Sequence, residues 1–318
     1  MPVRIRFLVL FALVLGCPSE APDPQVDPVV PLVPPPEAQG FQLEMLTTAP
    51  AGTEIWKCLV SPMPNVEVAA VNWVEYQQNP GLHHMTLSTP GLGPSNLEPG
   101  EYDCEDVYTG EFMENQVMFF GSQGNAEDTL NLPDGVVANF PVGLTVVHEV
   151  HFVNTTAEDV DVYSRVNAWT IPQTLVEDGI WGGSVRDENL NLPAGEDTTE
   201  WTRCVFNEDV EVHFLAAHQH KLGTRFTIAP YDGTTVGDLI FDNDDWHNPK
   251  ITQFDPPIVV PAGEGFEFQC TWRNTTENDI TYGLTSEDEM CNMAVVFTPF
   301  SVTAACEVVE TSDGVLWE

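Results

Sequence analysis

The chain has 318 residues, of which 42% are hydrophobic and 10% aromatic, so it can bury one large core or two of ordinary size and is not a disordered chain. Ten Lys and Arg stand against 49 Asp and Glu, which gives a formal net charge of −39. A surface this acidic does not neutralise phosphate groups, and nucleic acid is excluded as a partner.

The N-terminus has the features of a bacterial export signal. Two arginines precede an apolar run at residues 7–15, which is too short to cross a bilayer as a helix. Residues 14–17, Val-Leu-Gly-Cys, resemble a lipobox, in which the cysteine receives a lipid after cleavage. We therefore expect residues 1–17 to be a lipoprotein signal peptide and Cys17 to be the lipid attachment site; a plain secretory peptide is the alternative.

A proline-rich tether follows the signal. Residues 18–40 hold eight prolines and scattered acids without a hydrophobic period, which predicts an extended, semi-rigid linker. The folded body is expected to begin at Phe41. These segments predict a protein exported to the bacterial cell envelope. It would touch the outer or cytoplasmic membrane through its lipid anchor alone and face the periplasm or the cell surface.

The folded body is predicted to be almost entirely β. Runs rich in Val, Ile, Phe, Thr and Trp are bounded by Gly, Pro, Asn or Asp, and no stretch has the period of an amphipathic helix. The clearest runs cover residues 66–76, 144–153, 160–171, 210–228 and 266–272. A Pro-x-Gly phrase recurs at residues 133–135, 141–143, 193–195 and 261–263. Unrelated turns would give the same phrase, but the whole pattern favours two antiparallel sandwiches or jelly rolls.

The cysteine count indicates an oxidising compartment. Seven cysteines are present, and Cys17 is assigned to the lipid. The even set that remains is Cys58, Cys104, Cys204, Cys270, Cys291 and Cys306. Three disulfides are expected, although six cysteines leave 15 pairings open by arithmetic alone.

The most specific histidine pattern is a His-x-His pair. Alternation along a strand from residue 212 to 222 places His218 and His220 on one face, so two imidazoles project side by side. Such a pair can chelate one metal ion. His213 lies on the opposite face and is predicted to be a packed or hydrogen-bonded core residue.

The neighbours His83 and His84 are a weaker signal, because adjacent side chains on an extended strand point to opposite faces. Both can bind one ion only if the chain bends. Pro80 and Gly81, just before them, supply such an irregularity.

His148 and His151 are three residues apart, so their side chains diverge on a strand. His148 shares a face with apolar residues and is predicted to be structural. His151 shares a face with Glu149 and is predicted to be a ligand. His247 follows an acidic stretch and is predicted to lie on a surface turn, with a pocket position as the alternative. The stretch lacks the glycine and terminal glutamate of a calcium loop.

Four segments in sequence order carry a resemblance. They are Leu82-His83-His84-Met85, Val147-His148-Glu149-Val150-His151-Phe152, Ala217-His218-Gln219-His220-Lys221-Leu222-Gly223 and Asp288-Glu289-Met290-Cys291-Asn292. In this order they resemble the copper type II, ascorbate-dependent monooxygenases, a family that includes peptidylglycine α-hydroxylating monooxygenase and dopamine β-monooxygenase. The match spans about residues 50–308, and Asp-Glu-Met-Cys-Asn is its sharpest segment.

The resemblance implies an all-β fold of two tandem jelly-roll β-sandwich domains, each carrying one copper site. We place these domains at residues 41–157 and 158–318. The implied ligands of the electron-supplying copper in the first domain are His83, His84 and His151. The implied ligands of the catalytic copper in the second domain are His218, His220 and Met290.

The implied activity is hydroxylation of a C–H bond of a small organic substrate, with O2 and with ascorbate or a similar one-electron reductant. Imidazoles suit copper and zinc alike, so zinc is the alternative for the three-histidine set, whereas the thioether of Met290 favours Cu(I). A copper-binding lipoprotein without hydroxylase activity is the alternative function. A purely structural envelope protein would hold no stoichiometric copper.

The resemblance also implies three disulfides, Cys58–Cys104, Cys204–Cys306 and Cys270–Cys291. In the peptide-modifying member, an arginine and a tyrosine help hold the substrate carboxylate, and their positions are Ala216 and Ala294 here. Asn292 alone is retained. Amidation of glycine-extended peptides is therefore not expected, and a smaller or more apolar substrate fits an alanine-lined pocket better.

Overall fold

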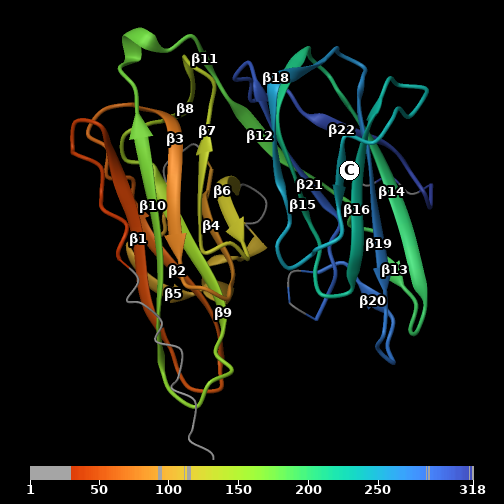
Figure 1. Cartoon of the computed structure of the whole chain (residues 1–318), viewed down its shortest axis with the longest axis horizontal. Helices are drawn as coiled ribbons and strands as arrows, with labels where there is room; N and C mark the ends of the chain where they lie inside the picture. Colours follow the sequence, from red (N-terminus) through yellow and green to blue (C-terminus); the bar gives the residue numbers. More distant parts are fainter. Residues whose placement is uncertain are drawn as a thin grey trace, which may run out of the picture. The chain divides into compact units, whose positions relative to one another are not determined.

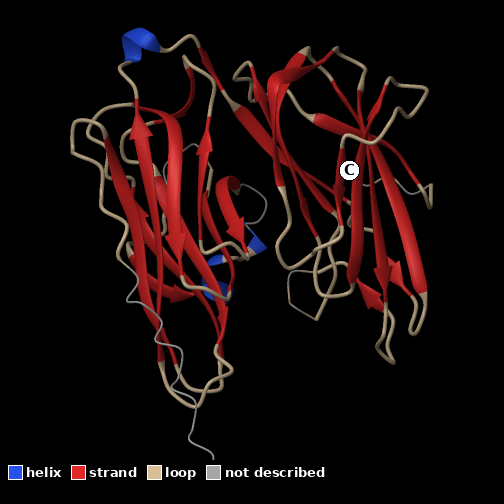
Figure 2. Cartoon of the chain, in the orientation of Figure 1, coloured by secondary structure: helices blue, strands red, loops and turns tan. Residues whose placement is uncertain are grey.

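The computed structural model describes residues 30–91, 95–110, 112, 116–283, 285, 287–314 and 316. In these ranges strands dominate, and the helical elements are short: α1 (Cys104–Val107), the 3-10 turn η1 (Gln173–Leu175) and helical residues at Gly110 and Phe112 (Figure 2). The predicted all-β fold class is confirmed. No helix in the described ranges is long and apolar enough to cross a membrane. The expected signal peptide, Cys17 and the linker up to residue 29 lie outside the described residues.

The first half of the chain forms two sheets (Figure 1). One sheet runs β1 (Gly40–Ala49), β10 (Val160–Thr170), β3 (Ala69–Gln78), β8 (Val136–Phe140) and β11 (Asp178–Gly179), with β7 (Glu127–Asn131) also paired to β3. The other runs β5 (Gly100–Asp103), β2 (Glu54–Pro62), β9 (Thr145–Val153), β4 (Leu82–Thr89) and β6 (Val117–Gln123). Met45 on β1 and Val150 on β9 belong to one buried core, so the two sheets pack as a sandwich.

The second half forms another sandwich. Its first sheet runs β12 (Trp181–Arg186), β21 (Asn292–Thr298), β15 (Val210–His218) and β18 (Ile251–Val260). Its second sheet runs β17 (Phe241–Asn243), β16 (Gly223–Tyr231), β19 (Gly265–Arg273), β14 (Asp197–Phe206) and β22 (Cys306–Thr311). A short pair, β13 (Asn191–Leu192) with β20 (Ile280–Thr281), completes it. The core between the sheets contains Phe297 of β21 and Phe268 of β19.

Alternation along the strands decides which side chains face this core. On β21, Met293, Val295 and Phe297 are at most 2% exposed. The residues between them, Ala294 and Val296, therefore lie on the opposite face of the sheet. That opposite face carries the second candidate centre described below.

The change from the first sandwich to the second comes later than predicted. β10 pairs with β1 and β3, and β11 pairs with β8, so residues 160–179 still belong to the first sandwich. The second sandwich begins with β12 at Trp181. The predicted boundary at residues 157/158 is therefore too early, because an apolar run does not reveal which sheet it joins.

The three predicted disulfides are present. Cys58 is bonded to Cys104, Cys204 to Cys306, and Cys270 to Cys291. Bonds of this kind persist in oxidising compartments, so they indicate an extracytoplasmic location.

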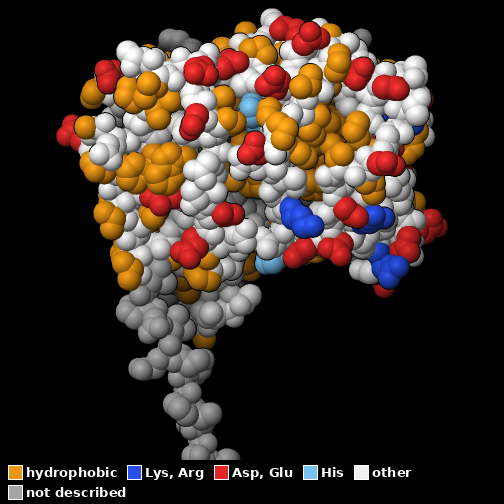
Figure 3. Space-filling view, turned by 45° about the horizontal axis from the view of Figure 1, so that its top comes forward, with side chains coloured by type: hydrophobic (Ala, Val, Ile, Leu, Met, Phe, Trp, Pro, Cys, Tyr) orange, Lys and Arg blue, Asp and Glu red, His pale blue; other side chains and the backbone are white. Residues whose placement is uncertain are grey.

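The surface is acidic, as the net charge of −39 requires. Asp and Glu side chains are spread over the face drawn in Figure 3, whereas Lys and Arg gather in one part of it. Hydrophobic side chains also reach this face.

Candidate metal centres

Two neighbouring strands position the first histidine cluster. β4 carries His83 and His84, β9 carries His151, and the pairing of these strands shifts register between Leu82 and His84. A bulge inserts an extra residue into one strand, so the side chains of His83 and His84 need not point to opposite faces. The bend that shared ligation requires is therefore present.

Three ring nitrogens converge in this cluster. Nδ1 of His83 lies 3.0 Å from Nδ1 of His84 and 3.2 Å from Nδ1 of His151. Potential ligand atoms of the three residues all lie within 4.8 Å of one another. Nitrogen ligands at about 2.0–2.1 Å from one tetrahedral metal ion are about 3.3 Å apart, so the spacing suits a shared ion.

Carboxylates hold the outer nitrogens of two of these rings. Nε2 of His84 donates to Oε1 of Glu149 at 2.9 Å, and Nε2 of His151 donates to Oε1 of Glu54 at 2.6 Å. A neutral ring that donates from Nε2 keeps the Nδ1 lone pair free. Carboxylate partners of this kind fix the tautomer and orientation of metal-binding histidines.

Glu149 is a buried carboxylate surrounded by donors. Besides the His84 ring, it accepts hydrogen bonds from Thr86 Oγ1 at 2.6 Å, Tyr108 Oη at 2.6 Å and Trp56 Nε1 at 2.5 Å. Burial by itself would raise the pKa of Glu149, but the neighbouring His84 ring and the hydrogen bonds from Thr86 and Tyr108 hold this pKa well below its usual range. The ionised carboxylate therefore places negative charge one ring away from the converging nitrogens.

The rings themselves are suited to bind metal at neutral pH. The pKa of His83 is lowered to about 3, chiefly by burial and then by the neighbouring His84 and His151. Burial also lowers the pKa of His151. Uncharged imidazole is the form that binds a metal ion.

The second candidate centre lies where β15 ends. His218 is the last residue of this strand, and His220 lies in the turn beyond it. The prediction that both belong to one strand is therefore wrong for His220. The two ring centroids are nevertheless 5.1 Å apart, so the imidazoles do lie side by side.

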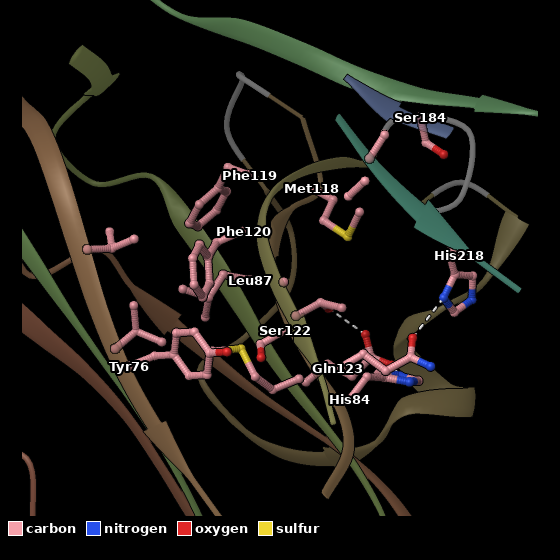
Figure 4. Close-up of a pocket in the computed structure, with 18 of the residues that line it drawn as sticks. Tyr76, His84, Leu87, Met118, Phe119, Phe120, Ser122, Gln123, Ser184 and His218 are labelled. Atoms are coloured by element: carbon pink, nitrogen blue, oxygen red, sulfur yellow. Dashed lines mark hydrogen bonds and ion pairs between the residues drawn. The ribbon is translucent and has the colours of Figure 1, made fainter. Parts of the chain in front are cut away.

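Carbonyl oxygens hold the Nδ1 atoms of both rings. Nδ1 of His218 donates to Oε1 of Gln123 at 3.0 Å (Figure 4), and Nδ1 of His220 donates to the backbone oxygen of Asp288 at 2.8 Å. Burial lowers the pKa of each ring, so both are neutral near pH 7. This tautomer leaves Nε2 as the ligand atom, the reverse of the arrangement in the first cluster.

Met290 lines the same pocket as His218 and His220. Its side chain is 8% exposed, and its Sδ accepts a hydrogen bond from Nδ2 of Asn292 at 3.2 Å. The segment that carries the Met290 sulfur is thus bonded to His220 through the backbone oxygen of Asp288, and two imidazoles with a thioether are a donor set that suits copper.

A second buried carboxylate, that of Glu289, is hydrogen-bonded to the segment that carries His220. Glu289 is fully buried and accepts backbone N–H groups from His220 at 3.0 Å and Leu222 at 2.7 Å, together with Trp272 Nε1 at 3.0 Å. Because Glu289 directly precedes Met290, one carboxylate fixes the segments of both ligand types relative to each other.

Two of the remaining histidines have structural partners, whereas His247 follows Trp246, whose ring lies 6.2 Å from that of His83 in the first cluster. His148 is buried and pairs with Ser164 Oγ at 2.8 Å, and His213 is buried and pairs with Thr298 Oγ1 at 3.1 Å. Both positions suit the predicted structural roles. His247 is exposed, as the surface-turn prediction has it.

Three carboxylates received no role from the sequence. Glu149 precedes His151 by two residues, and Glu289 precedes Met290 directly, so both could have been found as same-segment neighbours of a candidate ligand. Glu54 is 97 residues from His151 and reaches it only through the pairing of β2 with β9. No local signal marks Glu54.

Comparisons with known proteins support the resemblance in the second half of the chain. Residues 184–317 match the model of the copper type II ascorbate-dependent monooxygenase, C-terminal domain, which confirms the suspected family over these residues. Among solved structures, the STIV MCP aligns with 9% identity and a TM-score of 0.36, over 81% of this chain and 97% of the other. Infectious bursal disease virus Gx strain aligns with 12% identity and a TM-score of 0.17, over 82% of this chain and 71% of the other. Scores this low establish no shared fold.

Proposed function

Residues 184–317 carry the C-terminal domain of the copper type II ascorbate-dependent monooxygenases, and from this premise we propose that the protein is a copper-dependent monooxygenase. It would hydroxylate a C–H bond of a small organic substrate with O2 and an ascorbate-like reductant. Each chain would hold two copper ions, one in each sandwich.

This proposal rests on the hydrogen bonds that fix the tautomer of the histidine rings in each set. In the first sandwich the three Nδ1 atoms converge while Nε2 of His84 and of His151 is held outside by a carboxylate. In the second sandwich His218 and His220 are held through Nδ1, which frees Nε2. Hydrogen bonding that frees the inward nitrogen is expected of metal ligands rather than of ordinary buried histidines.

The bound copper ions and the side chains of the protein would supply different parts of the chemistry. Copper, when bound, supplies one-electron transfer and oxygen binding. The overall reaction inserts one oxygen atom of O2 into a C–H bond and releases the other as water, so each turnover consumes two electrons and two protons. The chain orients the imidazoles, balances the positive charge of a bound ion through Glu149, and offers Ala216 and Ala294 as small apolar contacts for a substrate.

A copper-binding protein without hydroxylase activity remains the second candidate, since the same ligands would hold the ions. The two functions differ in oxygen chemistry. A monooxygenase consumes O2 in proportion to hydroxylated product, whereas a binding protein holds copper without that stoichiometry.

Met290→Ile tests the proposal. The substitution keeps apolar volume and deletes the sulfur, and swaps of this kind usually change stability by less than about 1.5 kcal/mol. We expect wild-type protein to hold two copper ions per chain by metal analysis and to consume O2 with ascorbate and a substrate library. Met290→Ile should keep the copper of the first set and lose oxygen consumption and hydroxylation.

Met293→Ile is the matched control, because Met293 lies on the adjoining strand but points into the core. It should retain full activity. Wild-type turnover in folded Met290→Ile would remove Met290 from the centre. Copper bound without any oxygen consumption by the wild type would favour the binding protein, and absence of stoichiometric copper would exclude both functions.

A further inference from the structure

A proline-rich stretch at residues 30–36, Val-Pro-Leu-Val-Pro-Pro-Pro, precedes the first strand and contains no helix or strand. A proline fixes its own φ near −65° and holds the residue before it in the extended region. The stretch therefore favours a polyproline II helix, which has three residues per turn and no internal hydrogen bonds. Its backbone groups must find their partners elsewhere.

The burial of this stretch follows a period of three residues. Leu32 is half-buried and Pro35 is buried. The residues beside and between them are exposed: Pro31, Val33, Pro34 and Pro36. A residue and the third one after it lie on the same side of a polyproline II helix, so one side of the stretch faces the protein.

The surface under this side is the outer face of the sheet in which β1, β10 and β3 lie side by side (Figure 1). On β10, Val166 and Ala168 belong to the core, so Asn167 between them points outward. Asn167 is nevertheless 0% exposed. Gln77 follows the core residue Tyr76 on β3, also points outward, and is only 9% exposed. Outward side chains are buried here because the proline-rich stretch covers them.

Three amide side chains of this face bind the backbone of the stretch. The N–H of Leu32 donates to Oε1 of Gln77 at 3.0 Å, and Nε2 of Gln42 donates to the backbone oxygen of Leu32 at 3.0 Å. Nδ2 of Asn167 donates to the backbone oxygen of Val33 at 2.7 Å. Both backbone groups of Leu32 are thus paired, as a chain without internal hydrogen bonds requires.

The sheet itself orients these amides. Gln42, Asn167 and Glu75 are consecutive cross-strand partners. Gln42 donates to Oδ1 of Asn167 at 2.9 Å, and Asn167 donates to Oε1 of Glu75 at 2.9 Å. The same oxygen accepts Nε1 of Trp169, whose ring stacks on its cross-strand partner Trp73 at 4.7 Å. Grooves that recognise polyproline II chains are likewise lined by aromatic rings.

We propose that this face is a binding site for a polyproline II chain of the pattern Leu-x-x-Pro, and that residues 30–36 are its occupant within the same molecule. The first candidate metal centre lies on β4 and β9 of the other sheet, so docking and metal binding use separate sheets. Docking fixes the point at which the N-terminal segment leaves the folded body. Release would free residues 32–39, which at 3.3–3.6 Å per residue extend that segment by up to about 28 Å.

The test is competition by a peptide in trans. A fluorescent peptide with the sequence of residues 28–39 is titrated into the full chain, and binding is measured by anisotropy. A segment within the same molecule acts at an effective concentration in the millimolar range, so the wild type should bind the peptide poorly.

Leu32→Pro removes the N–H that Gln77 accepts, together with the half-buried side chain, and keeps the stretch extended. This variant should release its own segment and bind the wild-type peptide at least about tenfold more tightly than the wild-type protein does. Adding Gln42→Leu to this variant removes the donor to the Leu32 oxygen and should weaken peptide binding about tenfold.

Val33→Pro is the matched control, because the Val33 side chain is 73% exposed and its N–H bonds to no described residue. It should bind the peptide as poorly as the wild type. Thermal unfolding of each variant checks that the body is folded.

Poor binding by folded Leu32→Pro, or binding unchanged by Gln42→Leu, would overturn the site. Equal affinity for a peptide with proline in place of Leu32 would overturn the Leu-x-x-Pro pattern. A wild-type dimer in light scattering that the peptide dissociates would overturn the occupant within the same molecule, since the segment would then come from a second copy.

Discussion

At the scale of single residues, buried carboxylates shape both centres. Glu149 and Glu289 are each almost fully buried, and each accepts hydrogen bonds from several donors on separate segments of the chain. A buried charge is stable only when hydrogen bonds replace its lost hydration. Each carboxylate therefore holds its ligand segments in one arrangement, because any other arrangement would leave the charge unpaired.

Glu149→Gln removes the charge beside His84 and keeps the side-chain shape. We expect the affinity of the first centre for copper to fall by about 10- to 100-fold, the usual effect of losing an outer-shell partner, while the second centre is unchanged. Chelator competition on each site measures this. Glu54→Gln should lower this copper affinity less than Glu149→Gln does. The Glu54 side chain, which holds His151, is 49% exposed, so its charge is partly screened by water. Equal affinities in wild type and Glu149→Gln would contradict the orienting role.

His148 predicts a pH dependence of stability. Burial lowers its pKa to about 3 from an ordinary value of 6.5, so between these values the unfolded chain binds a proton that the folded chain does not. The free energy of unfolding should therefore fall as the pH falls from 6.5 toward 3, by on the order of a few kcal/mol for this group.

Urea unfolding of metal-free protein at several pH values measures this slope. His148→Gln should show a shallower slope than the wild type over the same range. His247→Gln, which alters an exposed histidine, should keep the wild-type slope. Identical slopes for all three proteins would show that His148 does not titrate between the two states.

At the scale of elements, the two sandwiches use the same turn after a central strand. Asn154 bonds the backbone oxygens of Ala49 and Glu158, and Asn274 bonds those of Leu192 and Asn278. Each asparagine is followed two residues later by a threonine that donates to its Oδ1. The buried amide closes the turn onto an earlier segment, which fixes the entry of the next strand in both halves.

The disulfide Cys270–Cys291 ties β19 to the residue after Met290. Replacing both cysteines by serine should lower the free energy of unfolding by about 2–4 kcal/mol and weaken copper binding at the second centre, because the Met290 segment loses its covalent tie. Thermal unfolding and site-resolved copper titration measure the two effects. The matched change of Cys58 and Cys104 should spare the second centre. Unaltered copper affinity at His218 and His220 in the first double variant would refute this role.

At the scale of the whole molecule, we propose that the N-terminal segment anchors an extracytoplasmic enzyme to a membrane through Cys17. Lipid chains contribute about 0.8 kcal/mol per buried CH₂, so anchoring should disappear in Cys17→Ser. Fractionation of cells that express each form measures the change. A wild-type protein found free of membranes, and cleaved at another site, would exclude the anchor.

The sequence alone determined the fold class and the candidate ligands. Strand alternation is a local pattern with a period of two, and it is visible in any run of residues. The even cysteine set predicted three disulfides, and the family resemblance supplied their pairing, which the structure confirms at all three pairs. The histidines and Met290 could be named because they lie in short, recognisable segments.

The tertiary structure decided the features that depend on which strands pair and in which register. The boundary between the sandwiches follows from the partners of β10, and a run of apolar residues does not specify its partner. The hydrogen bond between Glu54 and His151 joins residues that are 97 positions apart, and the pairing of β12 with β21 brings Arg186 opposite Asn292. Such neighbours are set by which strands pair and in which register, and the alternation within one strand carries no information about either.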